Sequence, residues 1–101
     1  MARLDVFRAP GKSARFYVLD VQADLLADLA TRVVVPLIPE ADMRKVAATL
    51  NPVFEIEGQR HVMLTQAIAT VPAKELRDVV SSLDAHHHTV LRAIDVLLTG
   101  V

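Results

Sequence analysis

β-Rich runs separated by turn residues fill most of this chain, and a long stretch with helical spacing follows them. The runs lie at residues 3–9, 14–22 and 32–38 and in the two halves of 51–66. The last stretch, residues 81–98, places one set of side chains on a single helical face: Leu83, His87, Val90, Leu91, Ile94, Leu97 and Leu98. Strands followed by one terminal helix are typical of an α+β fold.

Turn residues between neighbouring runs predict two hairpins. Pro10 and Gly11 open the "PGKS" turn between the first two runs, where proline fixes φ and glycine permits a positive φ. Gly58, in "EGQ", lies where the chain must reverse in the second hairpin. In the third run, Pro36 lacks the N–H that a central strand requires, which predicts that it lies at a sheet edge, a bulge or a strand end.

The segments between these runs are less regular. Residues 23–31, "ADLLADLAT", suit one or two helical turns or an irregular connection. Residues 67–76 contain a short amphipathic stretch. Ser81, three residues before Asp84, resembles a capping box at the start of the terminal helix. Residues 39–50 begin with proline and acidic residues and then predict a helix, because four apolar residues recur at helical spacing: Met43, Val46, Ala47 and Leu50.

Length and composition limit the architecture. A chain of 101 residues has the length of one domain, so we expect a single domain over residues 1–101. Hydrophobic residues make up 52% of the chain and aromatic residues 4%, so the core must consist mainly of valine, leucine, alanine and isoleucine. Cysteine is absent from the sequence, which excludes disulfides, zinc–thiolate sites and thiol catalysis.

Charge and hydropathy favour a protein partner. The net charge is −1, from 11 basic and 12 acidic residues, so there is no general attraction to nucleic acid or to an anionic membrane. Arg3, Asp5 and Arg8 interrupt the segment where a signal peptide would be apolar. The most apolar run, "VVVPLIP", is far shorter than the roughly 20 residues that span a bilayer. We therefore expect a cytoplasmic protein without membrane association.

Three consecutive histidines, His86, His87 and His88, invite a metal site. Neighbouring residues on a helix point about 100° apart, so these side chains cannot converge on one ion. We expect them to be solvated or half-buried, and we expect no bound metal and no cofactor. His87 shares a face with Leu83 and Leu91, which predicts that it is partly buried.

A possible catalytic set lies in the second predicted hairpin. His61 and Arg60 have Glu55, Glu57 and Thr65 nearby in the same hairpin. An imidazole, a guanidinium and a carboxylate could perform ribonuclease-type acid–base chemistry on a phosphodiester if they converged. Strand alternation places Arg60 and His61 on opposite faces, so a charged, solvent-facing hairpin is expected instead. The phosphate-binding loop, the dinucleotide fingerprint, "HExxH" and "GxSxG" are all absent from the sequence, which favours a function other than catalysis.

Two adjacent leucines, Leu25 and Leu26, belong to the segment "DVQADLL". On an irregular segment, adjacent leucines cannot both enter one core pocket. One of them is expected to face outward, although ordinary core packing of the segment stays open.

The ordered set "DVQADLL", "RVVVPL", "LNPVFEIEGQ", "MLTQAIATVP" and a terminal helix ending in Gly100 and Val101 resembles the CcdB family of toxins. These toxins belong to plasmid and chromosomal CcdA–CcdB modules. The resemblance covers essentially all 101 residues. It implies an antiparallel sheet, partly SH3-like and similar to CcdB and MazF, with a C-terminal α-helix. It also implies a homodimer, and irregular or strand-like structure where the spacing over 39–50 predicts a helix.

The resemblance further implies a function. Members of the family bind the A subunit of DNA gyrase and trap the enzyme on cleaved DNA. A CcdA-like antitoxin neutralises them, and the toxin–antitoxin complex represses its own operon, so contact with DNA is only indirect. The gyrase-binding surface is then assigned to Leu25, Leu26, Asp95, Leu98, Thr99, Gly100 and Val101. Thr99 stands where the family carries tryptophan in a Trp-Gly-Ile tail.

Two other functions stay open. Related MazF-type toxins share the general fold and cleave RNA, which would give roles to Arg60, His61 and Thr65. A retired toxin that only binds antitoxin is the other alternative, because Thr99 replaces the aromatic residue expected to contact gyrase. The resemblance also places the dimer interface near the C-terminal helix, with some of Ile94, Leu97 and Leu98 buried between the two copies.

Overall fold

The computed structural model describes residues 2–10, 16–44 and 46–100 of the chain. In this part, seven strands form one antiparallel sheet: β1 (Asp5–Arg8), β2 (Tyr17–Asp20), β3 (Thr31–Pro39), β4 (Val53–Ile56), β5 (Gln59–Met63), β6 (Ala69–Pro72) and β7 (Val79–Ser82). Short 3₁₀ helices connect them: η1 (Asp24–Leu26), η2 (Glu40–Asp42), η3 (Thr65–Ala67), η4 (Ala73–Glu75) and η5 (Asp84–His86). One α-helix, α1 (His87–Thr99), follows the last strand.

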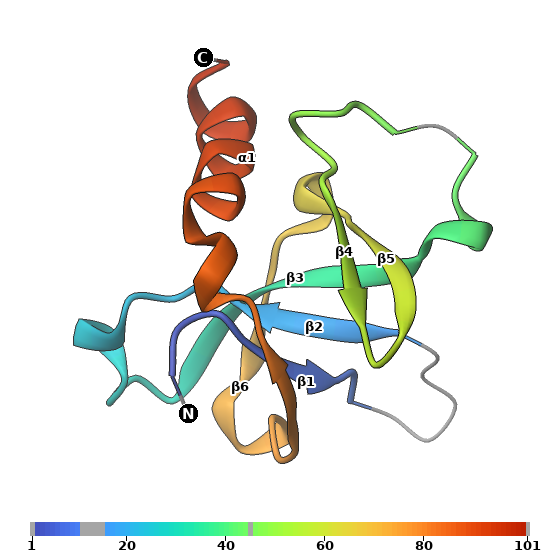
Figure 1. Cartoon of the computed structure of the whole chain (residues 1–101). Coiled ribbons are helices and arrows are strands. Elements are labelled where there is room, and N and C mark those ends of the chain that lie inside the picture. The colour runs from blue at the N-terminus through green and yellow to red at the C-terminus, as the bar shows by residue number, and fades with distance from the viewer. Residues whose placement is uncertain (1, 11–15, 45, 101) are drawn as a thin grey trace.

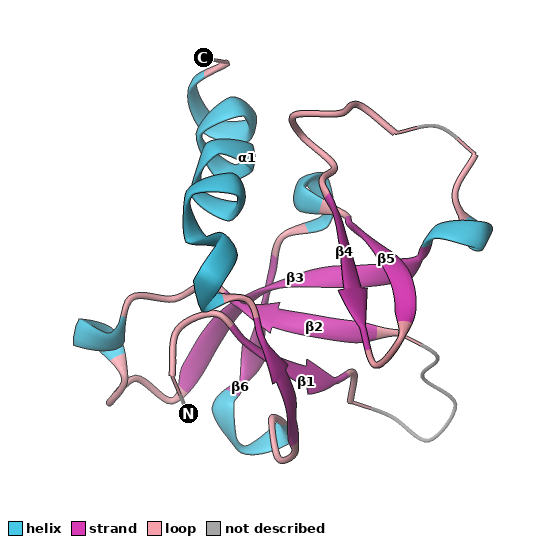
Figure 2. Cartoon of the chain, in the orientation of Figure 1, coloured by secondary structure: helices cyan, strands magenta, loops and turns pink. Residues whose placement is uncertain are grey.

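The sheet curls into a half-barrel around its longest strand, β3. The strand order is β4-β5-β3-β2-β1-β7, and β6 pairs with the part of β3 that β5 leaves free. Figure 1 shows α1 rising from one side of this sheet, and Figure 2 shows the short helices at its ends. The predicted antiparallel sheet with a C-terminal helix is confirmed.

Pro36 lies inside the central strand, so its predicted place at an edge, a bulge or a strand end is wrong. β6 pairs with β3 as far as Val34, and β5 begins to pair at Leu37. The Pro36 carbonyl accepts a hydrogen bond from the Leu64 N–H at 2.9 Å, so its backbone polar groups point into the gap between β6 and β5. No strand needs a donor at that point, and proline is tolerated there.

Both predicted hairpins are present. β1 pairs with β2, although the "PGKS" turn falls mostly on residues 11–15, outside the described part. β4 and β5 are joined by Glu57 and Gly58, with φ of +51° and +81°. Positive φ at both central residues is the signature of the two-residue turn whose twist matches the strands, and glycine adopts it without strain.

The helix predicted over 39–50 does not form. Only η2 is helical there, and Met43 already has an extended backbone (φ −108°, ψ 133°). Val46 is 48% exposed and Ala47 is exposed as well, so half of the apolar residues at helical spacing are not buried. Isolated helices of this length are marginal in water without such burial. The sequence also failed to indicate β6, which ends in a proline, and β7, which contains the Ser81 that was assigned to the start of the helix.

Hydrophobic side chains pack on both faces of the sheet. In β1, Val6 and Phe7 point to opposite faces, and both are fully buried. The larger cluster lies between the sheet and α1, which contributes Val90 and Ala93. Two-sided burial explains how a chain with few aromatic residues builds a core of aliphatic side chains.

The terminal helix begins later than the pattern predicted. Ser81 lies in β7, the predicted capping box is not formed, and the Ser82 hydroxyl accepts the hydrogen bond from the Asp84 N–H at 3.2 Å. Leu98 is 71% exposed, and His87 is exposed rather than partly buried. The face of α1 that is buried against the sheet carries Val90 and Ala93, so the side chains of Leu98 and His87 point away from the sheet.

A fully buried ion pair joins β2 to β3. Asp20 and Arg32 are 0% and 1% exposed, and the Arg32 Nε and Nη2 atoms both donate to Asp20 Oδ2, at 3.1 and 2.5 Å. Desolvating two charges is costly, and the geometry compensates only while both partners are present.

We predict that Arg32→Met lowers the free energy of unfolding by about 3 to 5 kcal/mol, because the Asp20 carboxylate is left buried without a counter-charge. Urea denaturation measures the loss. The control is Arg60→Met, which breaks the exposed ion pair with Glu40 and should leave the urea midpoint almost unchanged. Equal shifts of the midpoint in the two variants would contradict the structural role assigned to the buried pair.

Candidate functional site

Three exposed leucines stand on the loop between β2 and β3. All residues from 23 to 31 are exposed, and Leu25, Leu26 and Leu29 are 92%, 46% and 51% exposed. The sequence predicted that one of the two adjacent leucines faces outward, and in the structure both of them do. Leu29 was not predicted, although its place one turn after Leu25 and Leu26 could have indicated it. Large apolar side chains exposed together mark candidate binding surfaces.

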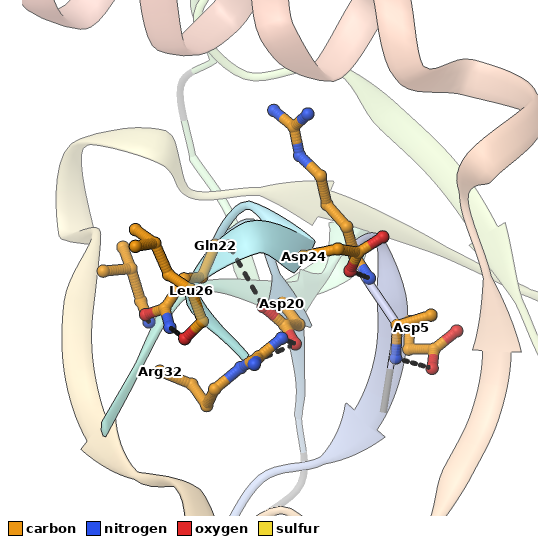
Figure 3. Close-up of polar contacts among 9 residues, drawn as sticks. Asp5, Asp20, Gln22, Asp24, Leu26 and Arg32 are labelled. Atoms are coloured by element: carbon orange, nitrogen blue, oxygen red, sulfur yellow. Dashed lines mark hydrogen bonds and ion pairs between the residues drawn. The ribbon is translucent and has the colours of Figure 1, made fainter. Parts of the chain in front are cut away.

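Buried polar groups hold this loop in place (Figure 3). Gln22 is only 6% exposed, and its Nε2 donates to the Leu26 carbonyl at 2.9 Å. Its Oε1 accepts from the Val33 N–H at 3.1 Å, and its own N–H donates to Asp20 Oδ1 at 3.0 Å. The second oxygen of that carboxylate binds Arg32. The loop is thus linked by hydrogen bonds to the buried ion pair.

The N-terminal segment supports the same loop from outside. The Arg3 N–H donates to Asp24 Oδ1 at 2.8 Å, and Asp24 is the first residue of η1. The backbone of the loop is further closed by turn bonds, including Leu29 N–H to the Leu26 carbonyl at 3.1 Å. Polar contacts therefore define the conformation in which the leucines are presented.

An apolar groove of about 400 Å³ separates the loop from α1. Its apolar lining comes from the loop, β3, the start of β6 and the helix, and includes Leu26, Leu29, Val33, Ile68, Leu91 and Ile94. Leu98 lies one turn beyond Ile94 on the helix, so the groove continues toward the end of α1 as an exposed apolar stripe.

The end of α1 has a local structural explanation. The Thr99 hydroxyl donates to the Asp95 carbonyl at 2.7 Å, inside its own helix. Gly100 has φ +75°, and its N–H donates to the Val96 carbonyl at 3.0 Å, which terminates the helix in the left-handed conformation that glycine favours. Asp95 is exposed, and Val101 lies outside the described residues.

The two parts of the predicted surface are not side by side in one chain. In Figure 1 the C-terminus lies at the far end of α1 from the loop that carries η1. Leu26 lines the groove opposite Leu91 and Ile94 of the helix, whereas Thr99 and Gly100 lie at the end of α1. The groove and the Leu98 stripe connect the two ends.

The predicted catalytic set does not converge. Arg60 points outward to Glu40, with Nε to Oε1 at 2.8 Å, and this hydrogen bond holds the pKa of the Glu40 carboxyl below its usual range. His61 is 1% exposed, on the opposite face as alternation predicted, so only Arg60 matches the expected solvent-facing hairpin. Thr65 is fully buried and donates to the Leu50 carbonyl.

A different group of polar side chains lies beside His61. The Tyr17 ring meets the imidazole edge-on, with centroids 5.0 Å apart, and the Tyr17 hydroxyl donates to Glu57 Oε1 at 2.5 Å. Arg8 Nη2 lies 3.3 Å from the same carboxylate oxygen. The sequence placed Glu57 near His61 in the second hairpin, but it did not indicate Arg8 and Tyr17, which come from β1 and β2. The hydrogen bond to Glu57 raises the pKa of Tyr17 above its usual value, since the carboxylate disfavours a tyrosinate.

The histidine tract serves packing and solvation. The His86 ring packs against Phe54 with centroids 5.3 Å apart, and the His87 and His88 rings lie 4.0 Å apart. Among the described residues, no cluster of three or more histidine or acidic side chains is arranged to hold a metal ion. In the same part of the chain, no helix is both long and apolar enough to cross a membrane.

We predict that Glu57→Gln lowers the pKa of Tyr17 toward about 10, because a neutral amide no longer repels the tyrosinate. Tyr17 is the single tyrosine and tryptophan is absent from the sequence, so an alkaline absorbance titration of the folded protein reads this group alone. The pKa of Tyr17 is higher in the folded than in the unfolded chain. The contribution of its hydrogen bond to the free energy of unfolding is therefore fully present below about pH 10 and is lost as the pH rises through the folded-state pKa.

Arg8→Met is the control for this titration. It removes a cation that lowers the pKa of Tyr17, so it should move the titration upward, opposite to Glu57→Gln. The assignment is wrong if both variants titrate like the parent protein while circular dichroism shows them folded.

The chain is similar to known proteins in both sequence and fold. The sequence profile of the family described as "CcdB protein" matches residues 3–100. A solved structure titled "Mycobacterium tuberculosis toxin MazF-mt6" is similar in fold, with a TM-score of 0.71 and 18% identity. The match covers 90% of this chain and 92% of that one. The two share the curled antiparallel sheet and terminal helix.

Proposed function

This chain belongs to the CcdB family of toxins from toxin–antitoxin modules, and from that premise we propose that it poisons DNA gyrase. In this proposal it binds the A subunit and traps the complex with cleaved DNA. A CcdA-like antitoxin releases gyrase by competing for the toxin. Because gyrase acts on chromosomal and plasmid DNA, the proposal places the protein in the cytoplasm.

The observation that best supports the proposal is the presentation of Leu25 and Leu26. The resemblance to the family assigns them to positions whose aliphatic side chains contribute to gyrase contact, and they are 92% and 46% exposed on a loop held by buried polar groups. A preorganised apolar surface is what a non-catalytic poison requires, since ordering a mobile loop on binding would weaken the complex. Asp95 and Leu98 extend the proposed surface along α1 toward Thr99, Gly100 and Val101.

A homodimer is part of the proposal. In one chain the loop and the tail lie at opposite ends of α1. Ile94 and Leu97 lie one helical turn apart on α1 and are only partly buried, and an isologous contact through them would bury both copies at once while Leu98 stays available to gyrase. Such a dimer presents two loops and two tails to a two-fold symmetric target. Contact with DNA stays indirect, through the repressor complex with antitoxin.

The ribonuclease alternative has less support in the geometry. Arg60 is engaged with Glu40, and the His61 ring lies under Tyr17 on the other face. The retired-toxin alternative rests on Thr99, which has no aromatic ring to place against a partner and whose hydroxyl is bonded within its own helix.

We predict that Leu25→Asp raises the toxin concentration needed to trap gyrase by at least about tenfold, because it places a charge in an apolar contact. Purified toxin, gyrase from the same host and supercoiled plasmid are mixed, and linear DNA is counted after denaturing the trapped complexes. Val46→Asp is the matched control, since Val46 is 48% exposed on another loop. If both variants trap gyrase like the parent, the leucine surface is not the binding site.

Failure of the parent protein to produce linear DNA would separate the alternatives. RNA cleavage that His61→Ala abolishes would favour the ribonuclease. Antitoxin binding with neither activity would identify a retired toxin. Either result overturns the gyrase proposal.

We predict that Thr99→Trp strengthens gyrase trapping. A buried aromatic at a hot spot is worth about 2 kcal/mol or more, which corresponds to roughly 30-fold in affinity. The exposed end of α1 accepts the larger side chain, because Thr99 is exposed. Thr89→Trp, on an exposed position at the other end of the helix, is the control. No gain from Thr99→Trp would mean that the tail does not contact gyrase in this protein.

A further inference from the structure

Gln22 is the only residue whose side chain bonds both to β3 and to the leucine loop within the described hydrogen bonds of this region. Its amide oxygen accepts from Val33, and its amide nitrogen donates to Leu26. The side chain is 6% exposed, so water cannot replace these bonds cheaply. One buried amide thus connects the sheet to the residue that begins the exposed apolar surface.

Apart from Gln22, the loop is shaped by its own turn bonds and by the contact between Arg3 and Asp24. No residue of η1 is buried, and of its three residues only Leu26, which lines the groove, adds apolar packing. The Leu26 carbonyl is a central acceptor, because it receives hydrogen bonds from both Gln22 Nε2 and the Leu29 N–H. Losing the bond from Gln22 would leave the position of Leu26 to local turn bonds and to the contact between Arg3 and Asp24.

We propose that Gln22 is a positioning residue for gyrase binding, acting through Leu25 and Leu26. This inference rests on the proposed function. Gln22 holds the loop in the conformation that presents both leucines, so gyrase does not have to order the loop on binding. Gln22 itself is buried and makes no contact with the partner.

Asn51 offers a matched control within the same chain. It is 3% exposed, and its side chain makes three hydrogen bonds where that of Gln22 makes two: with the Ala47 N–H, the Met63 carbonyl and Gln66 Oε1. It anchors a different exposed loop, the one that precedes β4. Removing either amide therefore removes a similar buried network, and only one of the two networks supports the leucines.

The experiment compares Gln22→Met and Asn51→Leu, which keep side-chain volume and remove the hydrogen bonds. Equilibrium affinity for the host's gyrase A subunit is measured for folded protein, as judged by circular dichroism. We expect Gln22→Met to weaken binding about tenfold and Asn51→Leu to change it less than about twofold. In a background that carries Leu25→Ala and Leu26→Ala, we expect Gln22→Met to change affinity less than about twofold, because its effect passes through those two side chains.

The outcomes separate this inference from the function on which it rests. If the two leucine substitutions do not affect gyrase binding, the proposed function's surface is wrong. If they weaken binding and Gln22→Met does not, the positioning role is wrong. A tenfold effect that persists in the leucine-free background would also overturn it, because Gln22 would then act elsewhere.

Folding of the variant is addressed by a second substitution. Gln22→Asn keeps a neutral amide at this buried position and is one methylene shorter, so its amide is less able to bridge the Val33 N–H and the Leu26 carbonyl. If Gln22→Met does not fold, Gln22→Asn takes its place in the same double-mutant comparison, with the same expected loss and the same contradicting results.

Discussion

The ion pair between Asp20 and Arg32 connects the core of this protein to its exposed loop. It lies where β2 ends and β3 begins, on either side of the loop that carries the leucines. Because the carboxylate is fully buried, each of its oxygens needs a donor. One oxygen binds Arg32, and the other binds the N–H of Gln22, which starts the loop. Charge burial therefore sets the direction in which the chain leaves the sheet.

A buried ion pair does not by itself make a protein more stable, because replacing both partners with hydrophobic residues of similar volume often gives a protein of equal stability. Its effect here is on conformation. An apolar pair at the same place would leave the Gln22 N–H without its acceptor and would not fix the orientation of the loop backbone. We interpret the buried charges as the means by which an exposed, apolar and poorly packed segment keeps one shape.

The curl of the sheet determines which side chains of α1 are buried and which stay exposed. β3 changes partner from β6 to β5 at Pro36, where neither neighbour requires an N–H donor. The curled sheet receives Val90 and Ala93 from the helix and leaves the stripe through Ile94 and Leu98 open. The groove beside this stripe and the leucine loop form one continuous apolar surface, which is the surface assigned to partners in the proposed function.

The sequence by itself determined β1 to β5, the terminal helix, both hairpins and the outward orientation of at least one of Leu25 and Leu26. These features depend on local chemistry, namely turn residues, alternation and helical spacing. Tertiary structure decided what local spacing could not. Residues 39–50 have helical spacing, but the fold leaves half of the apolar residues at that spacing exposed, so the helix does not form. His61 is buried beneath Tyr17 because strands distant in sequence meet there. The loop acquires its shape from Asp20, Gln22 and Arg32, whose contacts exist only once β2 and β3 have paired and excluded water from between their side chains.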